Sequence, residues 1–228
     1  FEHIARRVKA RQRCGEPGIS VDTKKKEPLG KLKNLGKTYR RKGDPVKVKT
    51  HDFPDKTLGQ AVPYGVFDLE HNAAGVSLGI SHDTAEFAIA AIRRWWRQRG
   101  CQRYAAPRRL LITADSGGSN SPRTRSWLTE LQRLADELKM IIEVGHVPPG
   151  TSQWNKIEHR LFCHITRNWK GVPLETLEII VSLIGSTTTE EGLEVPAWLV
   201  SQTCEKGRTV SDTKLSAVRI KRNPFHGD

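Results

Sequence analysis

The chain has 228 residues, which is enough to bury a hydrophobic core and suits one large domain, alone or with appendages. Its formal net charge is +13, from 38 Lys and Arg against 25 Asp and Glu, and such an excess indicates a polyanionic partner, most often nucleic acid. No apolar run approaches the roughly 18 residues of a membrane span, and the scattered cysteines suit a reducing cytoplasm better than disulfides or a zinc site.

The N-terminal part of the chain is strongly basic and only partly patterned. Residues 2–13 (EHIARRVKARQR) are typical of the end of a basic helix, because a stretch rich in Gly and Pro follows them. Residues 19–22 (ISVD) alternate between apolar and polar side chains, which indicates a strand. Residues 24–60 are rich in Lys, Gly and Pro, so we expect a basic insertion or loop. The chain opens at Phe1 and its only Met is Met140, so we also expect a fragment that lacks an N-terminal part.

The middle of the chain predicts a hairpin followed by a helix. The strand-like runs at 62–69 and 75–80 are separated by a short polar segment, which favours a hairpin. A helix is expected from Asp83 to about Arg99, because Asp83 and Glu86 match the spacing of a capping box.

Strands and helices then alternate. A continuous apolar run at 110–114 is typical of a strand buried on both faces, and Ser121 followed by Pro122 predicts the start of a helix. Further along, we expect a helix to about residue 139, a strand at 141–144, and helices at about 155–169 and 174–184.

This order of elements is the order of an RNase-H-like fold. We therefore predict an α/β domain with a mixed five-stranded sheet, order βββαβαβα, and helices on both faces. The domain is expected at 18–190 with the basic insertion at about 24–60. It follows the end of a basic helical region at 1–17 and precedes a weakly patterned C-terminal extension at 191–228. Fold alone does not give function.

Three acidic residues lie at the ends of strands or near the start of a helix in this predicted fold. Asp22 ends the first strand, and Asp115 follows the buried strand at 110–114. Glu158 lies one turn into the helix expected at about 155–169. Ligands collect at the carboxyl ends of strands in α/β sheets, so these acids would converge. Hard cations such as Mg²⁺ prefer oxygen ligands, and two such ions can activate the attacking oxygen of a phosphodiester reaction and stabilise the leaving one.

Each acid also has a purely structural interpretation. Asp22 could be a turn residue before the basic loop, and Asp115 could form an Asx-turn with the residues after it. Glu158 follows Asn155 by three residues, so this pair could be a plain helix cap. Asn155 shares a helix face with Glu158, and we keep it as a candidate for holding that carboxylate.

Four segments carry a resemblance to a known family: GISVDTKKKE (18–27), the run at 62–96, LLITADSGGSNSPRTRSW (110–127) and HVPPGTSQWNKIEHRLF (146–162). They resemble the Rhodopirellula-type DDE transposases of bacterial insertion sequences, over nearly the whole chain to about residue 215. The last segment also resembles the wider mariner-like group, in which a Pro-containing loop leads into an Asn-x-x-Glu helix.

The resemblance implies an RNase-H-like catalytic domain whose triad is Asp22, Asp115 and Glu158. These three residues would be both the catalytic residues and the ligands of two divalent ions, Mg²⁺ or Mn²⁺. The implied reaction is DNA cleavage at transposon ends followed by strand transfer into target DNA, in the cytoplasm of a bacterium. The implied partners are both DNAs, with a homodimer as the candidate assembly. The alternatives are an inactive DNA-binding remnant and another RNase-H-like nuclease that cuts without joining.

The positive charge is concentrated near the first of these acids. Residues 1–50 have a net charge of +11, whereas the remaining residues have a net charge of only +2. Basic side chains there could contact DNA phosphates near the metal site, although a solvated loop is the alternative. The candidates are Lys24, Lys25, Lys26, Lys31, Lys33, Lys37, Arg40, Arg41 and Lys42.

Overall fold

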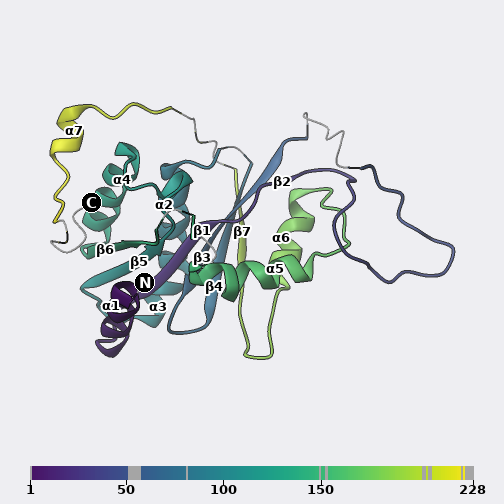
Figure 1. The fold of residues 1–228 in the computed structure, drawn as a ribbon, viewed down its shortest axis with the longest axis horizontal. Helices are drawn as coiled ribbons and strands as arrows, with labels where there is room; N and C mark the ends of the chain where they lie inside the picture. Colours follow the sequence, from purple (N-terminus) through teal and green to yellow (C-terminus); the bar gives the residue numbers. More distant parts are fainter. Residues whose placement is uncertain are drawn as a thin grey trace.

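The computed structural model describes residues 2–50, 58–80, 82–148, 150–151, 154–201, 204, 207–221 and 223. Its strands are β1 (Gly18–Thr23), β2 (Glu27–Pro28), β3 (Gln60–Asp68), β4 (Ala73–Gly79), β5 (Arg109–Ala114), β6 (Ile141–His146) and β7 (Ala197–Val200). Its α-helices are α1 (Glu2–Arg13), α2 (Ala85–Trp95), α3 (Cys101–Arg103), α4 (Arg125–Leu138), α5 (Cys163–Asn168), α6 (Leu177–Gly185) and α7 (Asp212–Ser216). Figure 1 shows their arrangement.

The strands form one mixed sheet in the order β6-β5-β1-β3-β4-β7, and β2 pairs with β3 off this path. β3 runs antiparallel to both of its neighbours, β1 and β4, whereas β1, β5 and β6 run parallel to one another. The five strands predicted from the sequence therefore lie in the RNase-H-like arrangement, which confirms the fold class. The sheet is larger than predicted, because β2 and β7 add to it; β7 lies parallel to β4 and comes from the region after residue 191.

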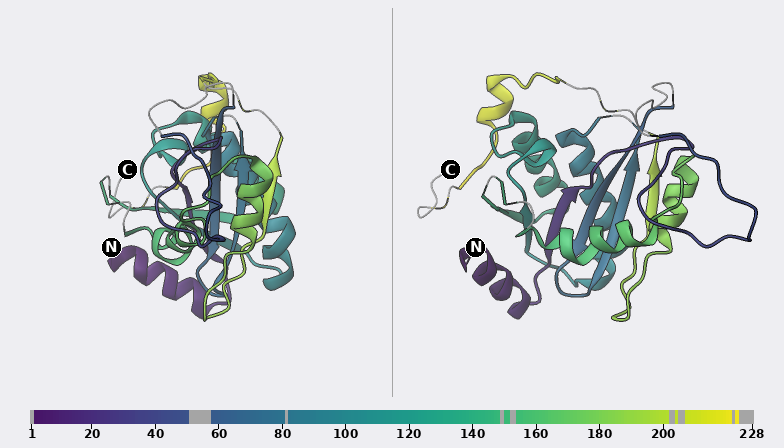
Figure 2. Two further views of the ribbon diagram at one scale, coloured as in Figure 1. Left: turned by 90° about the vertical axis from the view of Figure 1, so that its right-hand side faces the viewer. Right: turned by 45° about the vertical axis from the view of Figure 1, so that its right-hand side comes forward.

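Helices cover both faces of the sheet, as predicted (Figure 2). Successive side chains of a strand point to opposite faces, so each face has apolar side chains that a helix layer covers. Ile19 and Val21 of β1 belong to a core that includes residues of α2 and α4. The opposite core contains side chains of β3 and β4 together with residues of α5 and α6. At Gly65 of β3 the second helix layer comes very close: a Cβ there would lie 2.6 Å from the Phe162 ring. A larger residue at this position would push that helix away from the sheet.

Two predicted helix starts are wrong by a few residues. Thr84, not Asp83, caps α2: its Oγ1 accepts a hydrogen bond from the Phe87 N–H at 3.3 Å. The expected capping box at Asp83 is therefore absent, and Asp83 is available for another contact. α4 begins at Arg125 instead of directly after Ser121, because Ser121 starts a turn in which its carbonyl accepts from the Thr124 N–H at 3.1 Å.

The helices on either side of the sheet contain π-helical turns. A π-helical turn at Trp96–Gly100 continues α2 towards α3. Another at Glu158–Phe162 leads directly into α5, so the predicted helix at about 155–169 is present. Along the described residues, no helix is long and apolar enough to cross a membrane.

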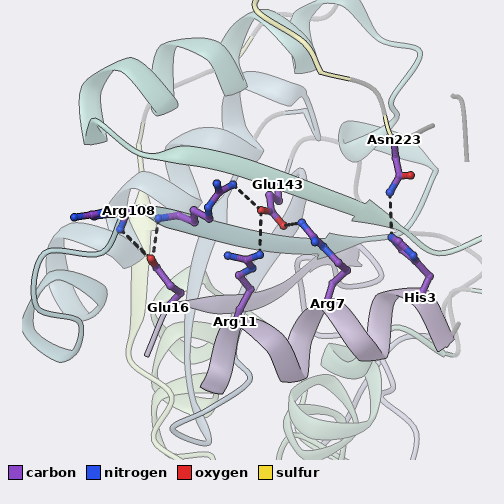
Figure 3. Close-up of polar contacts among 8 residues, drawn as sticks. His3, Arg7, Arg11, Glu16, Arg108, Glu143 and Asn223 are labelled. Carbon is purple, nitrogen blue, oxygen red and sulfur yellow. Dashed lines mark hydrogen bonds and ion pairs between the residues drawn. The ribbon is translucent and has the colours of Figure 1, made fainter. Parts of the chain in front are cut away.

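The N-terminal helix α1 is anchored on the β5–β6 edge of the sheet by one acidic residue (Figure 3). Glu143 of β6 accepts from Arg7 at 2.5 Å and from Arg109 of β5 at 3.0 Å, and Arg11 lies 3.6 Å away. After the helix, Glu16 accepts backbone N–H groups at the start of β5, the shorter at 2.9 Å. Basic residues of the predicted helix thus serve packing as well as surface charge.

The basic insertion at about 24–60 has little regular structure in its described part. It extends beyond α5 and α6 in Figure 1. It is tied down by Asn34, whose side-chain nitrogen donates to the carbonyls of Trp169 at 3.0 Å and Val172 at 3.2 Å. A bridge joins Leu32 to Lys49. The part of the insertion at 51–57 lies outside the described residues.

Candidate active site

Asp22 and Asp115 occupy equivalent places at the ends of two neighbouring parallel strands. Val21 of β1 pairs with Ala114 of β5, and the next residue on each chain segment is the aspartate. Most residues of both strands are buried up to that point, so the two carboxylates lie side by side at the same end of the buried part of the sheet. The register of the sheet therefore brings together two acids that are far apart in the sequence.

A cavity of about 220 Å³ opens at this place. It is lined by Asp22, Asp115 and a third acid, Asp83, together with the loop after Asp115 and the basic run after Asp22: Thr23, Lys24, Lys25, Lys26, Gly117, Gly118, Ser119 and Asn120. Glu158 is not part of this lining. Its charge nevertheless acts on Asp22, and the charge of Asp115 acts on Glu158, so the three predicted acids share one electrostatic environment.

Asp22 is held in a buried position that disfavours its charge. Its residue is only 6% exposed. Burial first, then the nearby charge of Asp115, raise the pKa of Asp22 from 3.8 to about 7, against the lowering effect of two hydrogen bonds. Those bonds come from the Thr23 N–H at 2.7 Å and the Asn155 amide at 3.2 Å. An oppositely charged ligand would relieve this cost.

Asn155 connects the first strand to the helix that carries Glu158. Its side-chain nitrogen donates to Asp22 and to the Val21 carbonyl, the latter at 3.0 Å. Its side-chain oxygen accepts from Ser20 Oγ at 2.5 Å, and Ser20 Oγ accepts from the Ile157 N–H at 3.2 Å. The sequence suggested Glu158 as the carboxylate that Asn155 holds, whereas its side-chain contact is with Asp22.

Glu158 has a cationic neighbour within the protein. Burial raises the pKa of Glu158, while the charges of Lys24 and His159 lower it. Lys24 itself is buried: its ammonium lies 4.6 Å from the centroid of the Trp169 ring and 4.0 Å from Glu27. Burial lowers the pKa of Lys24, and the charges of Glu27 and Glu158 oppose that shift. Lys24 therefore points into the protein, on the side of the site where Glu158 stands.

A side chain of the loop after β5 donates a hydrogen bond to Asp115. Asn120 donates from its side-chain nitrogen to Asp115 Oδ1 at 3.3 Å, and Tyr64 donates its hydroxyl to Asn120 Oδ1 at 2.7 Å. Burial, followed by the charges of Asp22, Asp83 and Asp115, raises the pKa of Tyr64 well above its usual value. The phenol therefore remains a hydrogen-bond donor.

Asp83 is the site residue that sequence reasoning missed. Thr23, the residue after Asp22, donates its hydroxyl to Asp83 Oδ1 at 2.9 Å. Gly118, which has a φ of +54°, brings the loop so close that a Cβ there would lie 3.3 Å from Asp83 Oδ2. The sequence shows a His-Asp pair at 82–83, but its pattern indicates Asp83 as the N-cap of the following helix and not as a residue of the site.

The other basic candidates separate into two groups. Lys25 and Lys26 are exposed at the rim of the cavity. The remainder lie in the exposed part of the insertion and do not line the cavity: Lys31, Lys33, Lys37, Arg40, Arg41 and Lys42.

The donor set fits a hard divalent cation, although the side chains are not gathered into a finished metal site. Among the described residues, no three His, Cys, Asp or Glu side chains group closely enough to hold a metal ion. The chemistry of the donors is nonetheless oxygen only, and burial first and then the charge of Asp115 raise the pKa of Asp22, which a bound cation would oppose. Asp22, Asp115 and Glu158 are thus the residues that could hold such an ion.

Comparisons with known proteins point to one family. The family model described as the Rhodopirellula transposase DDE domain matches residues 1–228. No curated protein is significantly similar in sequence. Among solved structures, the Mos1 mariner paired-end complex with Mn is similar with a TM-score of 0.49 at 15% identity, covering 78% of this chain and 50% of that chain.

Two further structures are similar. The Mos1 paired-end complex with the left transposon end has a TM-score of 0.48 at 14% identity, over 78% of this chain and 49% of that chain. A simian T-cell lymphotropic virus intasome has a TM-score of 0.35 at 12% identity, over 75% of this chain and 58% of that chain. The chain thus spans about half the length of the Mos1 chains that it matches.

Proposed function

Because the chain belongs to the Rhodopirellula transposase DDE family, we propose that it cleaves and joins DNA with Asp22, Asp115 and Glu158 as its catalytic residues. The observation that carries this proposal is the pairing of Val21 with Ala114, which sets Asp22 beside Asp115 in one cavity. Glu158 stands near enough for its charge to raise the pKa of Asp22. Carboxylates in this relation suit polynucleotidyl transfer better than a purely structural role, because their mutual repulsion is unfavourable without a cation.

The proposed reaction has two steps at this site. Water attacks a phosphodiester at the transposon end, and the bond to the departing 3′ oxygen breaks to leave a 3′-hydroxyl. That hydroxyl then attacks a phosphodiester of the target DNA, so that one P–O bond forms as another breaks. Two divalent ions bound by carboxylates would activate the attacking oxygen and stabilise the leaving one. The acids of this chain would hold those ions, and Mg²⁺ or Mn²⁺ would suit their oxygen ligands.

The surroundings of the triad support distinct roles for neighbouring residues. Asn155 would orient Asp22, since it donates to that carboxylate and is itself fixed by Ser20. Lys25 and Lys26, exposed at the cavity rim, would contact DNA phosphates, and the basic residues of the insertion would extend that contact. A homodimer is part of the proposal, because the described residues form one such site and a second copy would let two transposon ends be acted on at once.

The test is a cleavage and joining assay on labelled DNA that carries the element's own terminal repeats. The parent chain, Asp115→Asn and the matched exposed variant Asp44→Asn are compared with Mg²⁺, with Mn²⁺ and with EDTA. We expect metal-dependent nicks and joined products for the parent and Asp44→Asn, and neither for Asp115→Asn. An Asp115→Asn variant that cuts as well as the parent would contradict the assignment.

The same assay separates the alternatives. Cutting without joining, and without preference for the terminal repeats, would indicate another RNase-H-like nuclease. DNA binding that is sensitive to salt but indifferent to Mg²⁺, with no chemistry, would indicate a DNA-binding remnant. Sedimentation of the chain with and without terminal-repeat DNA tests the homodimer.

A further inference from the structure

Asn120 is a buried side chain placed between Asp115 and Tyr64. It is 1% exposed, and Tyr64 is fully buried. Tyr64 belongs to β3, so its position is set by the central sheet and not by the loop that carries Asn120. The main chain of Asn120 is fixed as well, because His146 of β6 donates from Nε2 to the Asn120 carbonyl at 2.8 Å. Both ends of this residue are therefore tied to strands of the sheet.

The Asp115 carboxylate and the Tyr64 hydroxyl together determine which way the Asn120 amide points. A phenol that donates to the amide oxygen at 2.7 Å leaves the amide nitrogen directed at Asp115 Oδ1, 3.3 Å away. Reversing the amide would place its oxygen against a carboxylate oxygen, which is repulsive, and would turn Tyr64 from a donor into an acceptor. The amide nitrogen that faces Asp115 is thus selected by the carboxylate, and the amide oxygen is held by a hydroxyl from β3.

Gly117 lies beside the other oxygen of Asp115. A Cβ at Gly117 would lie 3.2 Å from Asp115 Oδ2, and both residues line the cavity. Glycine at this position keeps the loop from covering that oxygen with a side chain. One oxygen of Asp115 is therefore held by an amide, and no side chain of residue 117 crowds the second.

The same construction occurs at the second aspartate. Ser20 fixes the Asn155 amide by donating to its oxygen at 2.5 Å, and the Asn155 nitrogen donates to Asp22 at 3.2 Å. In each case a buried hydroxyl orients a buried asparagine, which in turn orients an aspartate. Two independent copies of one arrangement in a single site favour a functional purpose over incidental core packing.

We propose that Asn120 and Tyr64 are positioning residues that hold Asp115 ready to bind a divalent cation. This inference rests on the proposed function and adds to it the residues that orient the second acid. Partners that orient metal ligands change metal affinity by about 10–100-fold when they are removed. Their contribution is measurable without DNA, as the affinity of the chain for Mn²⁺.

The experiment is a titration of free Mn²⁺ by electron paramagnetic resonance, on the whole chain at one pH. The variants are Tyr64→Phe, Asn120→Ala and Asp115→Asn. The matched control is Tyr104→Phe, which also removes a buried phenol that donates to an aspartate, here Asp68 at 2.8 Å, but outside the cavity. Thermal unfolding of each variant is measured in EDTA.

We expect the affinity for Mn²⁺ to fall by about tenfold or more in Asn120→Ala and by a smaller factor in Tyr64→Phe. Tyr104→Phe should lower the melting temperature yet bind Mn²⁺ like the parent. Tyr64→Phe removes a single oxygen atom, so it serves as the test even where Asn120→Ala does not fold.

The possible outcomes test the positioning role of Asn120 and Tyr64 separately from the proposed function. Loss of Mn²⁺ binding in Asp115→Asn, with parental affinity in Tyr64→Phe and Asn120→Ala, would overturn the positioning role alone. An equal loss of affinity in Tyr104→Phe would overturn it too, since the effect would then follow stability. A parent chain that binds no Mn²⁺, or an Asp115→Asn variant that binds it normally, would contradict the proposed function and this inference together.

Discussion

Asn155 donates from one side-chain nitrogen to both the Asp22 carboxylate, at 3.2 Å, and the Val21 carbonyl, at 3.0 Å. Because Asn155 stands just before the helical turn that carries Glu158, this pair of bonds sets the first strand and that helix at a fixed distance. The bond from the Ile157 N–H to Ser20 Oγ, at 3.2 Å, reinforces the same junction. The relative position of Asp22 and Glu158 thus depends on a buried amide and on the neighbouring bond to Ser20.

Replacing Asn155 by alanine should therefore harm both stability and cleavage. We expect the free energy of unfolding to fall by about 1–3 kcal/mol, because buried polar partners are left without a bond. DNA cleavage should fall further than this loss of stability explains. The control is Asn168→Ala, which removes a side chain bonded to the Leu183 carbonyl at 2.6 Å, outside the cavity. Urea denaturation and the nicking rate are the measurements, and equal nicking rates in the two variants would refute the coupling.

The start of α2 makes a second prediction. Thr84 caps this helix, whereas Asp83 points to Thr23. We expect Thr84→Ala to lower the free energy of unfolding by about 0.5–2 kcal/mol, the usual cost of losing an N-cap. Asp83→Ala should cost less stability, because it removes no cap. Urea denaturation of both variants measures this. A larger loss of unfolding free energy for Asp83→Ala would mean that Asp83 caps the helix, as the sequence suggested.

Most elements of the fold could be predicted from local patterns, but β7 could not. The run at 110–114 is buried throughout and apolar apart from Thr113, because β5 is covered on both sides, and that signal is strong. β7 has only four residues, and their burial pattern is mixed. Its place beside β4 results from pairing with a strand more than a hundred residues earlier, which no local pattern encodes.

The candidate site divides in the same way. Asp22, Asp115 and Glu158 could be proposed because each stands at a recognisable boundary of a predicted element. Asn120 and Tyr64 could not be linked, because their contact joins residues 56 positions apart and depends on the final packing of β3. Asp83 fits the capping rule as well as Thr84 does, and only the packing of α2 decides between them.

The attachment of α1 to the sheet makes a third prediction. Glu143 is the common acceptor of Arg7, Arg11 and Arg109. Glu143→Gln would remove the charge that holds these cations together, so amide hydrogen exchange in residues 2–13 should become faster. Glu137→Gln is the control, since Glu137 joins Arg93 and Arg97, each at 2.6 Å, in another part of the chain. Unchanged exchange in α1 would show that the ion pairs of Glu143 do not hold this helix on the sheet.

The rim lysines give a fourth prediction, concerning salt. Each phosphate contact contributes about 0.9 to the slope of log affinity against log salt on duplex DNA. The double variant Lys25→Gln/Lys26→Gln should reduce that slope by up to about 2 and weaken binding of any DNA sequence. The double variant Arg40→Gln/Arg41→Gln makes the same charge change in the exposed insertion, away from the cavity. Binding measured at several salt concentrations separates the two surfaces, and an unchanged slope for the rim variant would exclude those lysines as phosphate contacts.

The pKa of Asp22 gives a fifth prediction, concerning pH. Folding raises the pKa of this carboxyl from 3.8 to about 7, mainly through burial. Between these values the folded chain binds more protons at Asp22 than the unfolded chain does. The contribution of Asp22 to stability is therefore fully present below pH 3.8 and decreases as pH rises towards 7. Asp22→Asn has no such proton, so in EDTA the parent should lose stability relative to this variant over that range.

Divalent metal should reverse this trend for the parent only. A bound cation favours the charged carboxylate, so Mn²⁺ should stabilise the parent most at the upper end of the range and leave Asp22→Asn nearly unchanged. Melting temperatures of both chains, measured across pH 4–8 with EDTA and with Mn²⁺, provide the comparison. Parallel curves in EDTA would mean that Asp22 titrates as an ordinary exposed carboxyl. Equal stabilisation of both chains by Mn²⁺ would mean that the metal binds elsewhere.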